Sequence, residues 1–413
     1  MWEAIKANKR KSLFIIILMG LLLAALGGSI GGFIYPEQYQ QGILIGIGAA
    51  FLLWFILTLT ALFQGKNILL ALSGAREVSH SDAPQLFNIV EEMQIAAALP
   101  KMPKVFIMEE RAPNAFAVGT PENSAVAITT GLLSILSRDE LQGVIAHEIG
   151  HIKNLDTKFL TIAGVMLGTI VIISDVFVRA MFYGSLFGGR SRRRSNNNGG
   201  GGGIQIALFV IAIILAIVAP ILANLLYLAC SRTREYLADA SSAIFTRYPE
   251  GLASALEKIS QPQIPLTSSN RVTAPMYIVK PIMKAQGGGG GALFSTHPPT
   301  KERVTILRSM GNGAGLMNYN NAYKQIKGKS VIGERTLRTS EELKLRGVIP
   351  HSESSKVNIK QKTREATNIL HRLNNFIFIP CSCGFKIKVP PSYTKQTLRC
   401  PRCGHTHNVA DFT

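Results

Sequence analysis

Four long apolar runs constrain the fold of this chain more than any other feature of its sequence. Residues 12–34, 42–63 and 204–230 contain no charged side chain, and residues 159–182 contain one acidic and one basic residue. A helix needs about 20 apolar residues to cross a lipid bilayer, and each run reaches that length. The runs also account for a hydrophobic content of 47% in 413 residues. The sequence therefore predicts an α-helical membrane protein.

The cations around the first two runs predict how the chain enters the membrane. Four cations precede residue 12, the loop of residues 35–41 has none, and Lys66 and Arg76 follow the second run. Because cytoplasmic loops are enriched in Lys and Arg, we expect the N-terminus and residues 65–158 in the cytoplasm. The first run is too long for a signal peptide, so an uncleaved anchor is expected. These features predict a multi-pass protein of the cell (inner) membrane.

The loop between the third and fourth runs leaves their topology open. It contains four arginines, followed by an asparagine and glycine tract that is typical of a flexible linker. If residues 159–182 and 204–230 both cross the bilayer, these arginines lie outside the cell, against the charge rule. If the two runs enter as a hairpin without crossing, the rule holds. The sequence alone allows both arrangements.

Residues 146–154 read AHEIGHIKN and contain the pattern H-E-x-x-H. The surrounding residues 137–156 have apolar side chains at helical spacing. Ser137 followed by Glu140 forms a capping box, which predicts where the helix begins. The H-E-x-x-H pattern is therefore expected on a helix.

On that helix His147 and His151 lie four residues apart on one face, so both can point a ring nitrogen at one place. Glu148 follows the first histidine and lies beside the pair without being forced to bind the same ion. Two neutral imidazoles on a metal and a nearby carboxylate as base are what zinc-dependent hydrolysis requires. The pattern predicts a zinc site, provided that a third ligand exists.

The stretch after the fourth apolar run, SRTREYLADASSAIF, offers that ligand on a second helix. Glu235 can complete a His, His, Glu site, and Asp239, one turn on, can accept a hydrogen bond from the second ring nitrogen of His147. Alternatively, Glu235 pairs with Arg232 or Arg234 on a membrane-surface helix. The third and fourth runs separate His147 from Glu235, which meet only if those runs return the chain to the same side.

At this point the sequence resembles the HtpX-like membrane zinc metalloproteases, relatives of the CAAX prenyl protease family. The resemblance covers residues 1–305 and is carried by ALSGAREV (71–78), PNAFAVG (113–119), AVAITTGLL (125–133), RDELQGVIAHEIGHIKNLDT (138–157), SRTREYLADA (231–240) and STHPPTKERV (295–304). It implies that His147, His151 and Glu235 bind zinc and that Glu148 is the catalytic base. It also implies an α+β zincin-type (gluzincin-like) protease domain whose active site faces the cytosol.

The same resemblance gives expected roles to four further residues. His297, in the His-Pro segment, is a candidate to stabilise the negative oxygen of the transition state. Arg303 is expected to orient His297 or to hold a substrate carbonyl. Asn114 and Ala115 resemble substrate-facing positions of the family. Their surroundings, residues 113–119 and 124–131, have the alternation of β-strands joined by a turn, and one strand is expected to form the edge along which a peptide binds.

Four cysteines near the C-terminus form a second candidate metal site. They lie in two pairs, CSCG and CPRCG, separated by sixteen residues. The residues are Cys381, Cys383, Cys400 and Cys403. On a reducing, cytosolic side such pairs favour zinc over disulfides, and they resemble a small β zinc ribbon. The first pair is C-x-C where C-x-x-C is usual, so His405 or His407 is the alternative fourth ligand.

These features divide the chain into four expected parts. They are residues 1–64 with two transmembrane helices, 65–305 with the protease domain interrupted by residues 159–182 and 204–230, 306–375 as a basic linker, and 376–413 as the zinc ribbon. The expected cofactors are one catalytic and one structural zinc. The expected partners are protein or peptide substrates and the bilayer. For the basic ribbon, contact with membrane or protein is favoured over nucleic acid, because few aromatic side chains accompany its cations.

A rival from another class is a catalytically idle membrane scaffold whose ribbon binds protein, lipid or nucleic acid. An idle descendant would usually lose Glu148 or one of the ligands, and this chain has them all. A membrane endopeptidase that degrades membrane or misfolded proteins is therefore favoured. Since every catalytic motif precedes residue 305, a chain truncated there is expected to remain active. The oligomeric state does not follow from the sequence.

Overall fold

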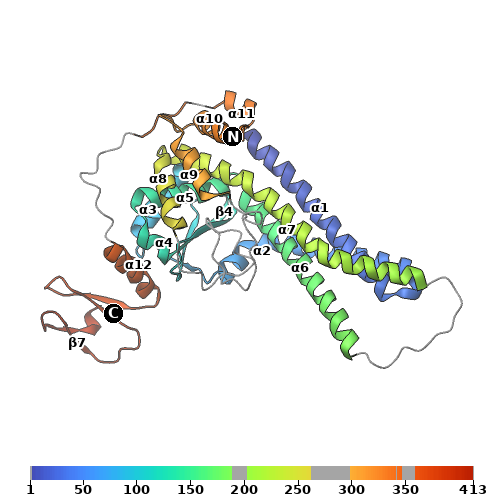
Figure 1. Ribbon diagram of the computed structural model, residues 1–413. Coiled ribbons are helices and arrows are strands. Elements are labelled where there is room, and N and C mark those ends of the chain that lie inside the picture. The colour runs from blue at the N-terminus through green and yellow to red at the C-terminus, as the bar shows by residue number, and fades with distance from the viewer. Residues whose placement is uncertain (1, 188–201, 262–297, 341, 347–358, 413) are drawn as a thin grey trace.

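The protein is described from a computed structural model that covers the chain apart from residues 1, 188–201, 262–297, 341, 347–358 and 413 (Figure 1). Its long helices are α1 (Trp2–Ile34), α2 (Tyr39–Leu72), α6 (Asp156–Phe187) and α7 (Gly202–Thr246). Each contains a segment long and apolar enough to cross a membrane, the shortest being Phe209–Leu226 with 18 residues. At 1.5 Å per residue that segment spans about 27 Å, close to the thickness of a bilayer core.

Large apolar side chains on these helices are exposed, which is unfavourable in contact with water. Large side chains such as Leu44, Phe63, Ile172 and Ile206 are each more than three-fifths exposed. Contiguous exposed apolar surface of this kind marks contact with lipid. Helices α1, α2 and α7 lie together in one bundle, and α6 packs against it near the protease body (Figure 1). The prediction of an α-helical membrane protein is confirmed.

The protease body combines a small sheet with helices around one central helix. Its strands are β1 (Arg76–Glu77), β2 (Lys104–Met108), β3 (Ala115–Thr120) and β4 (Asn123–Thr129), and its helices are α3 (Pro84–Ala96), α4 (Thr130–Ile135), α5 (Arg138–Lys153), α8 (Pro249–Ser260) and α9 (Thr300–Arg308). The sheet order is β1-β2-β4-β3, with β2 and β4 parallel and the other pairs antiparallel. This arrangement confirms the α+β protease domain.

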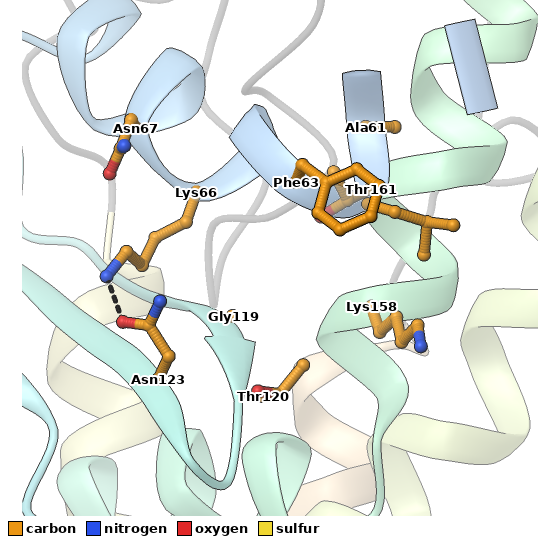
Figure 2. Close-up of a pocket in the computed structure, with 10 residues that line it drawn as sticks. Ala61, Phe63, Lys66, Asn67, Gly119, Thr120, Asn123, Lys158 and Thr161 are labelled. Carbon is orange, nitrogen blue, oxygen red and sulfur yellow. Dashed lines mark hydrogen bonds between the residues drawn. The ribbon is translucent and has the colours of Figure 1, made fainter. Parts of the chain in front are cut away.

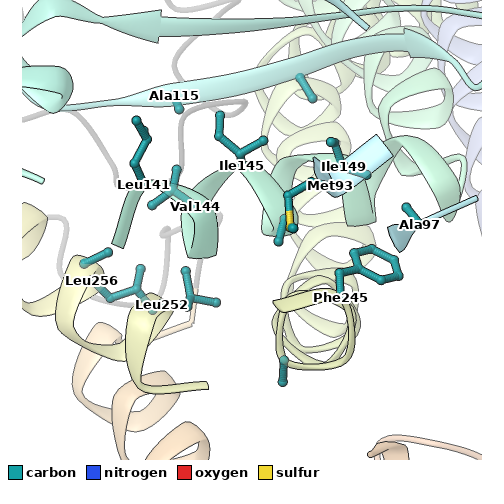
Figure 3. Packing of buried hydrophobic residues seen from close by; sticks show 14 of the residues in the cluster. Met93, Ala97, Ala115, Leu141, Val144, Ile145, Ile149, Phe245, Leu252 and Leu256 are labelled. Atoms are coloured by element: carbon teal, nitrogen blue, oxygen red, sulfur yellow. The ribbon is translucent and has the colours of Figure 1, made fainter. Parts of the chain in front are cut away.

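Helix α5 is the centre of the body and is buried along nearly its whole length. Apolar side chains from the sheet, α3, α7 and α8 surround it (Figure 3). A Cβ on Gly143 would lie 2.6 Å from the backbone nitrogen of Leu252, and one on Gly150 would lie 2.9 Å from the Cβ of Ser241. These two glycines therefore let α8 and α7 approach α5 closely. The predicted capping box of Ser137 is present at its start.

The predicted hairpin is present, with β3 at the edge of the sheet. Its register pairs Ala115 with Ile128 and Thr120 with Asn123. The second strand ends two residues earlier than predicted, because Thr129 caps α4 by accepting a hydrogen bond from the backbone N–H of Leu132. Among the described residues, β3 pairs with β4 alone and so lies at one edge of the sheet.

The turn of this hairpin is joined to the membrane helices (Figure 2). A cavity of about 120 Å³ lies there, lined by residues of α2, the turn and α6. The ammonium group of Lys66 on α2 donates a hydrogen bond to the Asn123 side chain, and the Thr157 hydroxyl on α6 donates to the carbonyl of Gly119 at 2.6 Å. The edge strand is therefore held at the point where two membrane helices enter the body.

The region expected to be a basic linker, residues 306–375, contains more structure than its charge suggested. Its helices are α10 (Leu316–Lys327), α11 (Glu334–Arg338) and α12 (Ile359–Leu373). Tyr319, Tyr323, Ile332 and Leu337 are buried in the same core as α5. The sequence predicted a polar, basic linker with only weak helical patches at 340–346 and 364–373, and the second patch lies within α12. A few apolar side chains of this region pack inward, although they show little periodicity in the sequence.

The last part of the chain forms two short hairpins. The strands are β5 (Ile377–Pro380), β6 (Lys386–Val389), β7 (Thr397–Arg399) and β8 (Thr406–Asn408), paired β5-β6 and β7-β8. Helix α12 packs on α4 and joins these hairpins to the body, where the ammonium group of Lys362 donates to the Leu136 carbonyl at 2.8 Å and Arg372 donates to the Ser81 carbonyl at 2.8 Å. A small β module at the C-terminus is confirmed.

Candidate metal centre and active site

The two histidines of the H-E-x-x-H pattern point at one place from the middle of α5. His147 and His151 are 1% and 8% exposed, and their Nε2 atoms lie 3.2 Å apart. The rings are nearly perpendicular, with centroids 4.7 Å apart. Their spacing of one helical turn brings them together, and the close packing of α5 on every side keeps water from most of the site.

Glu235 of α7 completes this group. Its Oε2 lies 3.6 Å from His147 Nε2, and its Oε1 lies 3.5 Å from His151 Nε2. The guanidinium of Arg234, one of the alternative partners of Glu235, lies 3.5 Å from Asp156, and the side chain of Arg232, the other one, lies outside the described residues. Helices α6 and α7 therefore do return the chain to the same side, as the sequence required if His147 and Glu235 were to meet.

The distances among these three side chains fit a tetrahedral zinc site. Zinc binds imidazole nitrogen and carboxylate oxygen at about 2.0–2.1 Å. Two ligands of a regular tetrahedron with such bonds are separated by about 3.3–3.4 Å. The three separations of 3.2, 3.5 and 3.6 Å bracket that value. The donor set, two nitrogens and one carboxylate, is also one that zinc uses in hydrolytic enzymes.

Each histidine has a carboxylate behind it. Asp239 Oδ1 lies 3.0 Å from Nδ1 of His147, and Asp156 Oδ2 lies 3.2 Å from Nδ1 of His151. Such contacts fix the ring orientation and leave Nε2 to face a metal. The contact of Asp239 with His147 was predicted from the sequence, whereas Asp156 was interpreted only as a capping or supporting group one turn beyond His151, without a specific role.

The position of Asp156 depends on the strained residue before it, Leu155. Leu155 has a φ of +61°, a conformation that L residues other than glycine rarely adopt, and it separates the end of α5 from the start of α6. This turn brings the Asp156 carboxylate back against His151 and within reach of Arg234. The sequence signal that could have indicated this carboxylate is its position in the turn after the H-E-x-x-H helix.

Arg303 of α9 lies behind the first histidine. It is 1% exposed and donates two hydrogen bonds to Asp239, from Nε at 2.9 Å and from a terminal nitrogen at 2.6 Å. Another terminal nitrogen lies 3.5 Å from Glu235 Oε2. The sequence reading expected Arg303 beside His297, which lies outside the described residues. Within the described chain, Arg303 contacts the carboxylates that surround His147.

Burial and charge oppose each other in this cluster. Burial lowers the pKa of His151, but hydrogen bonds to Asp156 and Glu235 outweigh it and raise that pKa to about 10. Burial also lowers the pKa of His147, and hydrogen bonds to Asp239 and Glu235 again raise it. The carboxylates thus favour positive charge between the two rings. A divalent cation would supply that charge in place of protons.

The remaining predicted residues of this site are buried nearby. Glu148 is 2% exposed on α5 and is not one of the three side chains whose ligand atoms converge. Asn114 and Ala115, at the start of β3, are 2% and 0% exposed. The Asn114 backbone pairs with Thr129, and Ala115 packs in the core beside α5 (Figure 3). Glu148 therefore lies on α5, and Asn114 and Ala115 lie at the start of the strand that packs against α5, while their predicted roles stay predictions.

The four cysteines converge in the C-terminal module. Sγ of Cys381 lies 3.4 Å from Sγ of Cys403, and the corresponding distance from Cys383 to Cys400 is 3.7 Å. Zinc–sulfur bonds of about 2.3 Å give a tetrahedral edge of about 3.8 Å. The converging ligand atoms are the four sulfurs, without either histidine of the alternative reading. This cluster could hold zinc.

The glycine after each cysteine pair makes the close approach possible. Gly384 and Gly404 have φ values of +80° and +75°, where a side chain would be strained. Their backbone N–H groups donate to the carbonyls of Cys381 and Cys400 at 2.9 Å. The shorter C-x-C pair therefore forms a knuckle of the same kind as C-x-x-C.

Comparison with known proteins gives consistent matches over about three quarters of the chain. Residues 80–311 match the model of peptidase family M48. A protease HtpX homolog of Dictyoglomus thermophilum is 45% identical over 318 residues, which cover 77% of this chain and 97% of the relative. Homologs of the same description from Streptococcus gordonii and Listeria monocytogenes are 42% and 43% identical, and the matches cover 75% of this chain and 100% of each relative. A crystal structure of Ste24p from S. mikatae aligns with 74% of this chain and 67% of its own, at a TM-score of 0.37 and 18% identity.

Proposed function

The chain belongs to peptidase family M48, and from that premise we propose that this membrane metalloprotease is a zinc-dependent endopeptidase. It would hydrolyse peptide bonds of membrane or misfolded proteins at the cytosolic face, which makes it an enzyme of protein quality control. The observation that carries the proposal is the convergence of His147, His151 and Glu235 at distances that suit zinc.

These three residues would hold the metal, which would polarise the substrate carbonyl and make a water molecule more acidic. Glu148 is the proposed general base, because it is buried next to the first histidine without joining the ligands. It would take a proton from that water and deliver it to the leaving amine. Asp239 and Asp156 would hold the two imidazole rings in the orientation that binding needs.

The edge strand β3 is the proposed platform for the substrate. An extended peptide that pairs with β3 would be held by main-chain hydrogen bonds and would lie beside α5, which carries both histidines. The side chains of Asn114 and Ala115 are buried, so the backbone of this strand would make most of the contact. His297 stays the candidate for stabilising the developing negative oxygen, and Arg303 is assigned to supporting Asp239.

The four-cysteine module is proposed to hold a second, structural zinc. We also retain the proposal that the active site and the C-terminus face the cytoplasm, which follows from the cations around the first two spans. A catalytically idle scaffold is the weaker alternative, since an intact ligand set and a buried Glu148 have no obvious use in a protein that only binds.

The proposed base can be tested by replacing Glu148 with Gln in the full-length protein. The variant should bind as much zinc as the wild type, because the side chain is not a ligand, and should lose at least about 1,000-fold in kcat. Cleavage of casein in detergent and metal analysis of the same sample measure both effects. Gln361, which lies on α12 away from this cluster, offers a matched control as Gln361→Glu. Cleavage by Glu148→Gln near the wild-type rate would refute the assignment.

A further inference from the structure

Helix α10 follows the part of the chain that matches the family model, yet it packs against the back of the metal centre. The match ends at residue 311, and α10 begins at Leu316. The helix contacts both α9, which carries Arg303, and α7, which carries Glu235. Its buried face includes Tyr319 and Tyr323, which are 0% and 5% exposed. A segment that the sequence predicted to be a linker therefore borders the candidate site.

The contacts of α10 involve the residues next to the site residues in sequence. Tyr236, directly after Glu235, packs its ring against Tyr323 with centroids 4.8 Å apart and an angle of 72°. The hydroxyl of Tyr236 also donates to Glu302, directly before Arg303, and Lys327 of α10 lies 2.6 Å from the same carboxylate. Helix α10 thus fastens α7 and α9 together at the level of the proposed third ligand.

Tyr319 lies deepest in this contact. Its hydroxyl is buried and has no hydrogen-bond partner within the described parts of the chain. Burial raises its pKa well above the usual value, and Asp239 raises it further while Arg303 lowers it, so both charged groups lie within electrostatic reach. Since the hydroxyl makes no hydrogen bond to the described residues, we assign the contribution of this residue to its aromatic ring.

The ion pair between Arg303 and Asp239 joins the two helices against which α10 packs, and it is sensitive to water. Arg303 and Asp239 are 1% and 0% exposed and are joined by two hydrogen bonds. A buried ion pair is strong only while its surroundings stay dry and its hydrogen bonds keep their geometry. Asp239 in turn holds Nδ1 of His147 at 3.0 Å. Water behind Arg303 would loosen Asp239 and with it the orientation of the ligand.

We propose that Tyr319 is a positioning residue of the metal centre: its ring seals the Arg303–Asp239 pair from water and so fixes His147 for metal binding. Helix α10 is then part of the functional unit of the protease rather than of a linker. The inference rests on the proposed function, because it assigns Tyr319 to the zinc site proposed there.

Full-length Tyr319→Leu and Tyr319→Phe variants test the proposal against Met317→Ala, a control on the same helix at a residue that is 42% exposed. Zinc affinity of the protease site is measured by competition with a chelator, and ligand geometry by the absorption of cobalt substituted for zinc. Loss of a supporting contact behind a ligand typically weakens metal binding by about 10–100-fold. We expect that loss for Leu, with a similar fall in kcat and an unchanged KM, and near wild-type values for Phe and for the control.

Each outcome decides the proposal. A folded Leu variant with wild-type zinc affinity, cobalt spectrum and kcat would overturn it, and so would a Phe variant as impaired as Leu, because the hydroxyl would then be the active part. If Leu does not fold, Tyr323→Leu replaces it and should weaken zinc binding through Tyr236; unchanged binding would refute the role of α10. A wild-type protein that neither binds zinc at this site nor cleaves casein would refute the proposed function itself.

Discussion

The two candidate metal sites of this protein are built in opposite ways. The His, His, Glu site takes its ligands from α5 and α7, 84 or more residues apart in sequence, and each histidine is held by a further carboxylate. The four-cysteine site takes its ligands from two local knuckles within 23 residues, inside a module with a small apolar core. The first site depends on the fold of the whole body, whereas a module as small as the second depends on its metal.

This contrast implies different sensitivities. Removing one ligand from the first site should leave the fold intact, since α5 lies in a large core that does not need the metal. Removing one from the second should unfold the module, since little besides the metal holds its two hairpins together. Three experiments would break or sharpen the comparison.

The largest effect is expected for Glu235→Ala. The change removes one ligand and the partner of two imidazoles, so proteolysis should fall by more than about 1,000-fold and the zinc content should drop from two ions per chain to one. Circular dichroism should show an unchanged helical content. Full retention of both ions would mean that another residue is the third ligand, and Asp239 would be the first residue to examine.

A smaller and reversible effect is expected from brief treatment with phenanthroline. The first site, with nitrogen and oxygen ligands and an open position, should release its zinc, while a closed shell of four thiolates should keep its ion. Proteolysis should stop with about one zinc remaining, and X-ray absorption should show only sulfur at about 2.3 Å.

The matched variant for that experiment is Cys400→Ser. It should lose the second ion and keep peptide cleavage within about twofold, because none of the four cysteines touches the protease site. If the remaining zinc in the chelated sample is bound by both sulfur and nitrogen, His405 or His407 is a ligand of the second site. If the chelated wild-type protein retains no zinc, the assignment of a zinc ribbon is wrong.

The smallest effect concerns Glu140, which anchors the start of α5. Burial raises its pKa, but hydrogen bonds from Lys258, Ser254 and the backbone N–H of Ser137 outweigh this and lower it overall. A lowered pKa in the folded state stabilises the protein above the unfolded value near 4.5, and that stability is lost as the pH falls through the lowered pKa.

The corresponding variant, Glu140→Gln, should reduce the free energy of unfolding of the protease body at pH 7 by about 1–2 kcal/mol. The difference from wild type should shrink below pH 4, where the native carboxylate also becomes protonated. Thermal melts at several pH values measure it. An equal loss of unfolding free energy at pH 3 and pH 7 would mean that the charge of Glu140 does not contribute to stability. A change in the stability of the C-terminal zinc module would contradict the independence of the two sites.

The sequence indicated the features that depend on local spacing. The capping box of Ser137, the one-turn spacing of His147 and His151 and the two cysteine pairs all appear where they were predicted. Each follows from residues fewer than about ten positions apart, where helical or turn geometry alone decides which side chains meet.

The features that the sequence did not indicate depend on contacts between distant segments. Arg303 contacts Asp239 only because α9 packs beside α7. Asp156 is a local exception: it lies five residues after His151 and reaches it through the left-handed conformation of Leu155. No role was predicted for Tyr319, because its segment is polar and basic and has little apolar periodicity. Packing partners of this kind have no local pattern, so a single sequence does not show them.

Helix α7 runs without interruption from Gly202 to Thr246, so the segment predicted to span the membrane and the turn that bears Glu235 form one rod. About nine residues, or some 13 Å, separate the end of the apolar segment at Leu226 from Glu235. A rigid rod transmits tilt, and transmembrane helices tilt to match the thickness of the lipid around them. Pro220 within the helix is the place where such a rod bends most easily. A change in the tilt or bend of α7 would therefore move Glu235 relative to the two histidines of α5.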